Sequence, residues 1–136
     1  MKNYRDIDIE LEKIIFLINA DEGNHRLFEL ILELSIFNIT IDEKYKIAKQ
    51  ILIEFIQRNF IVFEEFENSS LEKKIRIIST DEVYSILDNP YYWWYPCNDN
   101  KVIIITLTSS GESFLDKEIP KIKDKIRDRY RNCKNK

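Results

Sequence analysis

Few side chains in this sequence could do acid–base chemistry, and no motif groups them. The segment EEFENSSLE carries three closely spaced carboxylates, Glu64, Glu65 and Glu67, and carboxylate pairs are common groups in general acid–base catalysis. No recognisable pattern places a histidine, lysine or nucleophile beside them, so we predict that the protein is not an enzyme. These carboxylates are then interpreted either as the charged, solvated edge of a strand or as an acidic surface for a basic partner.

The residues that could bind a metal are too few and too scattered. The chain has a single histidine, His25, and two cysteines far apart, Cys97 and Cys133, whereas a zinc site needs several ligands of these types. We therefore predict no metal ion and no cofactor, and we interpret His25 as a polar residue at the start of a helix. Both cysteines are expected to be free thiols in a reducing cytoplasm.

The segment TSSGES contains serines and a glycine but no catalytic or phosphate-binding pattern. It lacks the Gly-x-Ser-x-Gly elbow of serine hydrolases and the Gly-Lys of a phosphate loop. We predict instead that Ser109 or Ser110 caps a helix, and that Gly111 allows this helix to pack closely against a sheet.

The strongest candidate for a binding surface is a run of five aromatic residues: Tyr91, Tyr92, Trp93, Trp94 and Tyr95. Neighbouring side chains of an extended segment point to opposite faces, which would place Tyr92 and Trp94 on one face and the other three rings on the opposite one. We expect one set to anchor the segment on the core and the other to stay partly exposed. Exposed Tyr and Trp residues are typical of protein-binding hot spots.

The charges are divided unevenly along the chain. Residues 117–136 hold nine basic and three acidic residues, a net charge of +6. Because the whole chain carries −3, residues 1–116 carry −9. An acidic body of this kind repels phosphate backbones and attracts basic partners.

Hydrophobic spacing predicts one mostly helical α+β domain over residues 1–136. It would have a core at about 7–118, a small antiparallel sheet, and a basic C-terminal helix or tail at about 119–136. We expect helices at 6–20, 25–37, 41–58 and 81–88, one beginning after Thr108 and one opened by Pro120, and strands at 60–66, 73–78 and 101–108.

Local sequence signals mark two of the expected helix starts. Thr40 precedes Glu43 by three residues, and Ser79 precedes Glu82 by the same distance, which is the spacing of a capping box. No apolar run approaches the roughly 18 residues needed to cross a bilayer, so we expect no membrane association.

Two segments resemble a winged-helix domain, ILIEFIQRNFIVFEEF and VIIITLTSSGESFL. In that family an apolar third helix feeds a strand, as Leu52 to Ile61 would do here. A last strand ending in Leu-Thr-x-x-Gly then returns into a helix, and the matching residues are Leu107, Thr108 and Gly111. Asn59 stands where a glycine is usual, and asparagine also tolerates left-handed backbone geometry.

A narrower resemblance concerns the segment STDEVYSILDNPYYWWYP before the last strand. It is similar to small bacterial winged-helix-like proteins that are often encoded beside polymorphic or contact-dependent toxins, as immunity proteins. This resemblance implies a cytoplasmic protein that blocks a basic toxin domain by occlusion. The aromatic run and the carboxylates of EEFENSSLE would then form the partner-binding surface.

The alternative function is that of a winged-helix transcriptional regulator, which could dimerise through the terminal helix. Its DNA contacts would come from the third helix and the tail, namely Lys44, Lys46, Lys49, Arg127, Arg129 and Arg131. The outer face of the third helix has no arginine, although arginine is the commonest side chain for reading guanine. The carboxylates at the expected wing also oppose binding to phosphate.

Overall fold

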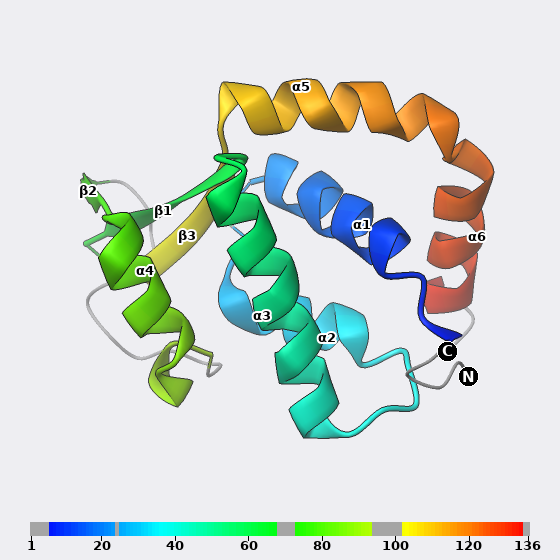
Figure 1. Cartoon of the computed structure of the whole chain (residues 1–136), viewed down its shortest axis with the longest axis horizontal. Helices are drawn as coiled ribbons and strands as arrows, with labels where there is room; N and C mark the ends of the chain where they lie inside the picture. Colours follow the sequence, from blue (N-terminus) through cyan, green and yellow to red (C-terminus); the bar gives the residue numbers. More distant parts are fainter. Residues whose placement is uncertain (1–5, 24, 68–72, 94–101, 135–136) are drawn as a thin grey trace.

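The computed structural model describes residues 6–23, 25–67, 73–93 and 102–134. In these ranges the chain forms six α-helices and one three-stranded antiparallel sheet, which confirms the predicted mostly helical α+β class (Figure 1). The elements in chain order are α1 (Ile9–Asp21), α2 (Leu27–Leu34), α3 (Ile41–Gln57), β1 (Ile61–Phe66), β2 (Lys74–Ile77), α4 (Thr80–Leu87), the 3-10 helix η2 (Pro90–Trp93), β3 (Val102–Leu107), α5 (Ser109–Glu118), the 3-10 helix η3 (Ile119–Lys121) and α6 (Lys123–Lys134).

The sheet has the strand order β2-β1-β3, with β1 antiparallel to both neighbours. β1 and β3 pair along their whole length, from Ile61 opposite Leu107 to Phe66 opposite Val102. β2 is an outer strand, and all of its residues are exposed. Beyond β3, the loop between α1 and α2 adds a single bridge in which the amide of Ile105 donates to the carbonyl of His25 at 2.8 Å.

The core lies where α1 and α3 meet the inner face of the sheet. The α3 side chains that face it are completely buried, and they are Ile47, Ala48, Ile51, Leu52 and Phe55. Phe16 of α1 stacks on Phe55 with ring centroids 5.9 Å apart, and Phe63 of β1 is also fully buried. This helical spacing of apolar residues on α3 agrees with the pattern expected from the sequence.

Two helices begin where the capping signals place them. Thr40 accepts from the amide of Glu43 at 3.1 Å, and the Glu43 carboxylate accepts from the amide of Thr40 at 2.8 Å, which is a complete capping box. Ser79 accepts from the amide of Glu82, so it also caps its helix. The Glu82 side chain binds Arg76 instead of returning to the cap, so only half of the second box forms.

The turn from α3 into β1 and the start of α5 are held together by close backbone approach. Asn59 adopts a left-handed conformation with φ of 60°, as its place in the sequence predicts. Gly111 lies against the backbone of Phe60, and a Cβ added at Gly111 would overlap the Phe60 carbonyl oxygen. The predicted close packing at Gly111 is therefore present, and its neighbour is Phe60, the residue directly before β1.

Several details of the expected helices are wrong, among them the start of α1, which is Ile9 and not residue 6, and the end of α2, which is Leu34 and not residue 37. α2 begins at Leu27 and not at His25, because the backbone of His25 pairs with β3 and cannot also start a helix. Thr108 caps α5 in place of the predicted serines, since its hydroxyl accepts from Gly111 at 3.0 Å. Pro120 lies in η3, and the non-helical Ile122 delays the start of α6 to Lys123.

The two C-terminal helices run along the outside of α1. Figure 1 shows α5 passing above α1 and α6 descending at the right, beside the first residues of α1. None of the described helices is both long enough and apolar enough to span a membrane.

Candidate functional site

The described part of the aromatic run, Tyr91 to Trp93, forms a short 3-10 turn (η2) and not the extended segment predicted from the sequence. Tyr91 and Tyr92 are exposed at 46% and 37%, whereas Trp93 is only 4% exposed. The expected alternation, which placed Tyr91 and Trp93 on one face, is wrong because a 3-10 helix repeats every three residues and separates these rings. Trp94 and Tyr95 lie outside the described residues.

This turn is fixed by the residues that end α4. The side chain of Asn89 accepts from the amide of Tyr91 at 3.1 Å, and its carbonyl accepts from the amide of Tyr92 at 3.2 Å. The indole of Trp93 donates to the Leu87 carbonyl at 3.0 Å. Its ring also meets the ring of Tyr45 on α3 edge to face, with centroids 5.3 Å apart. The turn is therefore attached to two helices.

The two tyrosines of this turn form a pair on the surface. Their ring centroids are 5.4 Å apart and their planes are nearly perpendicular, at 84°. This is a favoured arrangement for two aromatic rings. Because the neighbouring Trp93 is buried and hydrogen-bonded, the pair is presented by a backbone that is already in place. We call Tyr91 and Tyr92 the tyrosine pair.

The carboxylates of β1 do not form a free acidic surface. Glu65 is buried and lies 3.4 Å from Arg76. Glu67 lies 3.8 Å from Lys73. The cations on and beside β2 therefore balance much of the negative charge that the sequence predicted for this region.

Glu64 shows the same compensation in more detail. Its carboxylate accepts from Lys74 at 2.8 Å and from the hydroxyl of Thr106 at 2.7 Å. Burial alone would raise the pKa of Glu64, but these two hydrogen bonds and the charge of Lys74 together outweigh it and lower that pKa. Glu64 is therefore an ionised, partnered group of the sheet.

The lysines of α3 are partly engaged within the protein. Lys44 donates to the hydroxyl of Ser35 at 3.3 Å. Lys49 lies 3.6 Å from the carboxylate of Asp88 at the end of α4. Lys46 is exposed and has no ion pair among the described residues. Two of the three lysines therefore already have partners within the protein.

The C-terminal arginines have different environments. Arg127 and Arg131 are exposed, and among the described residues their ion pairs are with carboxylates of their own helix, Asp124 at 2.7 Å and Asp128 at 4.0 Å. Arg129 is buried and binds Glu12 of α1. Its predicted role as a DNA contact is wrong, because its guanidinium is enclosed and already bound to carboxylates.

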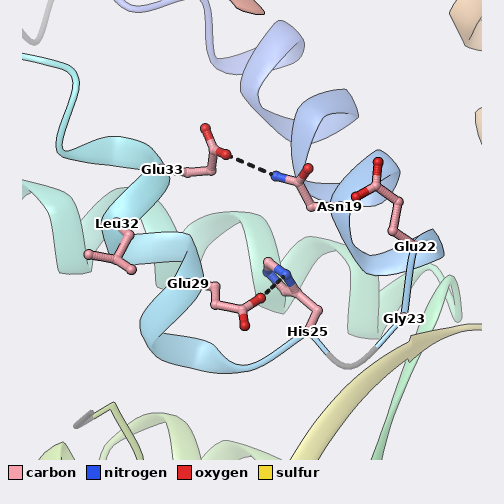
Figure 2. Close-up of a pocket in the computed structure, with 7 residues that line it drawn as sticks. All are labelled: Asn19, Glu22, Gly23, His25, Glu29, Leu32 and Glu33. Atoms are coloured by element: carbon pink, nitrogen blue, oxygen red, sulfur yellow. Dashed lines mark hydrogen bonds and ion pairs between the residues drawn. The ribbon is translucent and has the colours of Figure 1, made fainter. Parts of the chain in front are cut away.

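A cavity of about 340 Å³ lies between the end of α1 and the exposed side of α2 (Figure 2). The end of α1 and the following loop contribute Asn19, Glu22, Gly23 and His25, and α2 contributes Glu29, Leu32 and Glu33. The volume is at the lower end of the range for small-ligand sites. We call this cavity the acidic pocket.

His25 is the most enclosed residue of the acidic pocket, with only 2% of its surface exposed. Nδ1 lies 2.9 Å from the Glu29 carboxylate. Burial lowers the pKa of His25 from 6.5 to about 4, so the imidazole is neutral at pH 7 and this contact is a hydrogen bond to a carboxylate. Burial also raises the pKa of Glu29.

Sequence reasoning missed the acidic pocket. The i,i+4 spacing of His25 and Glu29 and the further acids Glu22 and Glu33 were available as a signal. The backbone bridge to β3 that holds His25 in place is a long-range contact, and no local pattern predicts it. The tyrosine pair and the acidic pocket are thus the two candidate sites in the described part of the chain.

No protein-family model, curated protein or solved structure matched this chain in the comparisons.

Proposed function

We propose that the protein acts by binding another protein, and more specifically that it is a cytoplasmic immunity protein that neutralises a cognate toxin by occlusion. The tyrosine pair is the observation that carries this proposal. Tyrosine is enriched in interface hot spots because it buries a large area while its hydroxyl still finds a polar partner. Two adjacent tyrosines on a fixed turn provide such an anchor.

The fixed backbone of the turn supports tight binding. Ordering a flexible side chain at an interface costs roughly 0.5–1.5 kcal/mol. The tyrosine pair has little backbone freedom left to lose, since Asn89 and Trp93 already hold the turn through hydrogen bonds. Tyrosine also has only two side-chain torsions, which keeps the remaining cost low.

The charge of the protein supports a basic partner. The net charge is −3, and the acidic excess lies in residues 1–116. An acidic surface speeds the approach of a basic protein, and this effect weakens as the salt concentration rises. The carboxylates in and just after β1 contribute less negative charge to the surface than the sequence implied, because Lys73, Lys74 and Arg76 lie close to them.

The proposal is tested by co-expressing the protein with the toxin candidate encoded by the adjacent gene and measuring growth and complex formation. The double variant Tyr91→Ala/Tyr92→Ala should weaken binding by about 2 kcal/mol or more, roughly thirtyfold, and abolish protection. The control is Ile77→Thr, which removes another exposed apolar side chain and should leave protection intact. Unchanged protection by the double variant, at equal protein levels, would refute the role of the tyrosine pair.

DNA binding is the second candidate, and the exposed cations of α6 favour it. Arg127 and Arg131 are exposed on α6, and their ion pairs within the described ranges are with carboxylates of that helix. A regulator should bind one operator sequence, with an affinity that falls steeply as salt rises. We expect only weak duplex binding without sequence preference, and the variant Arg127→Gln/Arg131→Gln should remove it. This variant is preferable to deleting the helix, because deletion would leave Glu12 buried without its cation.

A further inference from the structure

The polar atoms that line the acidic pocket are mostly hydrogen-bond acceptors. The amide nitrogen of Asn19 is already used, because it donates to Glu33 at 3.2 Å, and the Asn19 oxygen is left as an acceptor. One oxygen of Glu29 accepts from His25, and the backbone of Arg26 also hydrogen-bonds to this carboxylate. Glu22 lies on the rim and forms no ion pair within the described ranges. A ligand for this pocket must therefore bring donors.

His25 adds an unused acceptor in the same place. A neutral imidazole has one donor and one acceptor nitrogen, so donation from Nδ1 to Glu29 leaves the lone pair on Nε2. Nε2 is buried and has no hydrogen-bond partner within the described residues. Figure 2 shows the imidazole reaching from its loop toward the Glu29 side chain, with Asn19 above it. Leaving a buried polar atom unpaired is unfavourable, and a ligand that donates to it would relieve that cost.

We propose that the acidic pocket binds a guanidinium group. A guanidinium has five donors in one plane, no acceptor, and a permanent positive charge, which matches a wall of acceptors and carboxylates. It is also more weakly hydrated than an ammonium group, so it costs less to bring into a partly closed cavity. The exposed Leu32 on the rim offers apolar surface for the flat face or the stem of the ligand.

The described side chains favour an organic cation over a metal ion. No group of three His, Cys, Asp or Glu side chains in those ranges is placed to hold a metal. Two of the carboxylates are also committed to other partners, Glu33 to Arg129 at 2.9 Å and Glu29 to His25. Carboxylates held apart in this way can each accept one hydrogen bond from the N–H groups of a planar guanidinium. They are not placed to coordinate one metal ion together.

The guanidinium can come from a free small molecule or from an arginine side chain of a protein. The pocket is distinct from the tyrosine pair, so its ligand can be tested without knowing the partner of the proposed function. N-acetyl-arginine amide is the probe for the group itself. N-acetyl-citrulline amide has nearly the same shape but a neutral urea in place of the cation, and it is the matched control. A short Gly/Ser peptide with one central arginine tests the second source.

The single histidine makes the binding measurement specific. His25 is the only histidine of the chain, so a histidine side-chain ¹H–¹⁵N spectrum of the whole protein reports one imidazole. We expect the arginine probe to shift the Nε2 signal with a dissociation constant on the order of 1 mM, as suits a ligand of this size. The citrulline probe should bind at least about tenfold more weakly, because it lacks the charge-assisted hydrogen bonds.

Substitutions at two adjacent positions test whether the probe binds in the acidic pocket. Glu22→Gln removes a carboxylate from the rim and should weaken the arginine probe about threefold, a typical effect for an exposed charge. Asp21→Asn removes the same charge one residue away, outside the pocket lining, and should change the affinity by much less.

The outcomes separate the two sources and can reject the site. Tighter binding of the arginine peptide than of the amino-acid amide indicates a protein side chain, and equal binding indicates a small cation. If neither arginine probe moves the Nε2 signal, or if citrulline binds equally well, the proposal is overturned. Loss of protection in the Tyr91→Ala/Tyr92→Ala variant would not alter this result, so the two proposals fail independently.

Discussion

Arg129 binds Glu12 through two parallel hydrogen bonds, although the two residues are 117 positions apart. Nε donates to one carboxylate oxygen at 2.8 Å and Nη2 to the other at 2.9 Å, and both side chains are buried. Nη2 also donates to the carboxylate of Glu33 on α2 at 2.9 Å. One arginine of α6 thus connects α6 with α1 and α2. This contact holds α6 against two helices of the acidic part of the chain.

Removing Arg129 should destabilise the protein strongly. Arg129→Met leaves Glu12 buried without its cation, and breaking a buried pair from one side costs about 3–5 kcal/mol. Urea unfolding at pH 7 measures this loss. Arg131→Gln is the control, because Arg131 is exposed and should change the stability by less than about 0.5 kcal/mol. Similar losses in both variants would show that Arg129 is not enclosed as described.

The double variant Glu12→Leu/Arg129→Met should recover much of that loss. Burial raises the pKa of Glu12 even though the hydrogen bonds and charge of Arg129 act to lower it, so desolvation is the larger effect. Replacing both buried charges with apolar groups removes that desolvation cost, and such exchanges are often neutral. A double-mutant cycle by urea unfolding gives the coupling energy. Strictly additive losses would contradict a direct pair.

Alanine at Gly111 should destabilise the protein even though alanine is the better helix former. In an open helix the change would stabilise by about 1 kcal/mol. Here the new Cβ meets the Phe60 carbonyl, and such a backbone overlap costs about 1–3 kcal/mol. Thermal unfolding measures the difference. The exposed Ser110→Ala has no such neighbour and should be nearly neutral, so a stable Gly111→Ala variant would contradict the close contact.

Truncating Trp93 should lower stability, whereas truncating Tyr91 should not. Trp93→Phe loses the hydrogen bond to the Leu87 carbonyl and part of the packing against Tyr45, at a cost of about 1–3 kcal/mol. Tyr91→Ala removes an exposed ring and should change the unfolding free energy by less than about 0.5 kcal/mol. Urea unfolding of both variants tests this division, which would be wrong if Tyr91→Ala were the more damaging change.

His25 should titrate far below an ordinary histidine. Burial lowers its pKa from 6.5 to about 4, so between these values the unfolded chain binds a proton that the folded protein does not. The contribution of His25 to stability is therefore complete above about pH 6.5 and is lost as the pH falls toward 4, by roughly 3 kcal/mol. An NMR titration of the single histidine gives the midpoint directly. A midpoint near 6.5 would contradict the buried position.

The NMR readout is needed because other groups titrate in the same pH range. The pKa of Glu29, which faces His25, is raised by burial, and this shift affects stability with the opposite sign. A plain curve of stability against pH would therefore mix both effects. The variant Glu29→Gln keeps a hydrogen-bond acceptor for Nδ1 and shows how much of the His25 shift depends on the carboxylate.

The sequence by itself determined the elements whose signals are local. The capping box of Thr40 and Glu43 joins residues three apart, and the apolar face of α3 needs only a helical repeat. Asn59 and Gly111 could also be interpreted correctly, because each residue type suits a backbone geometry that few others tolerate. In each case the deciding interaction lies within a few residues or in the residue type.

Only the tertiary structure decided which polar and aromatic side chains are free. Arg129 and Arg131 look equivalent in the sequence, yet one is buried by contacts with α1 and α2 and the other is exposed. Tyr91 and Trp93 are separated by a 3-10 turn that depends on the end of α4 and on packing against α3. His25 is held by a bridge to β3. These outcomes depend on contacts between segments distant in the chain, and a side chain's type and local spacing do not determine what will cover it.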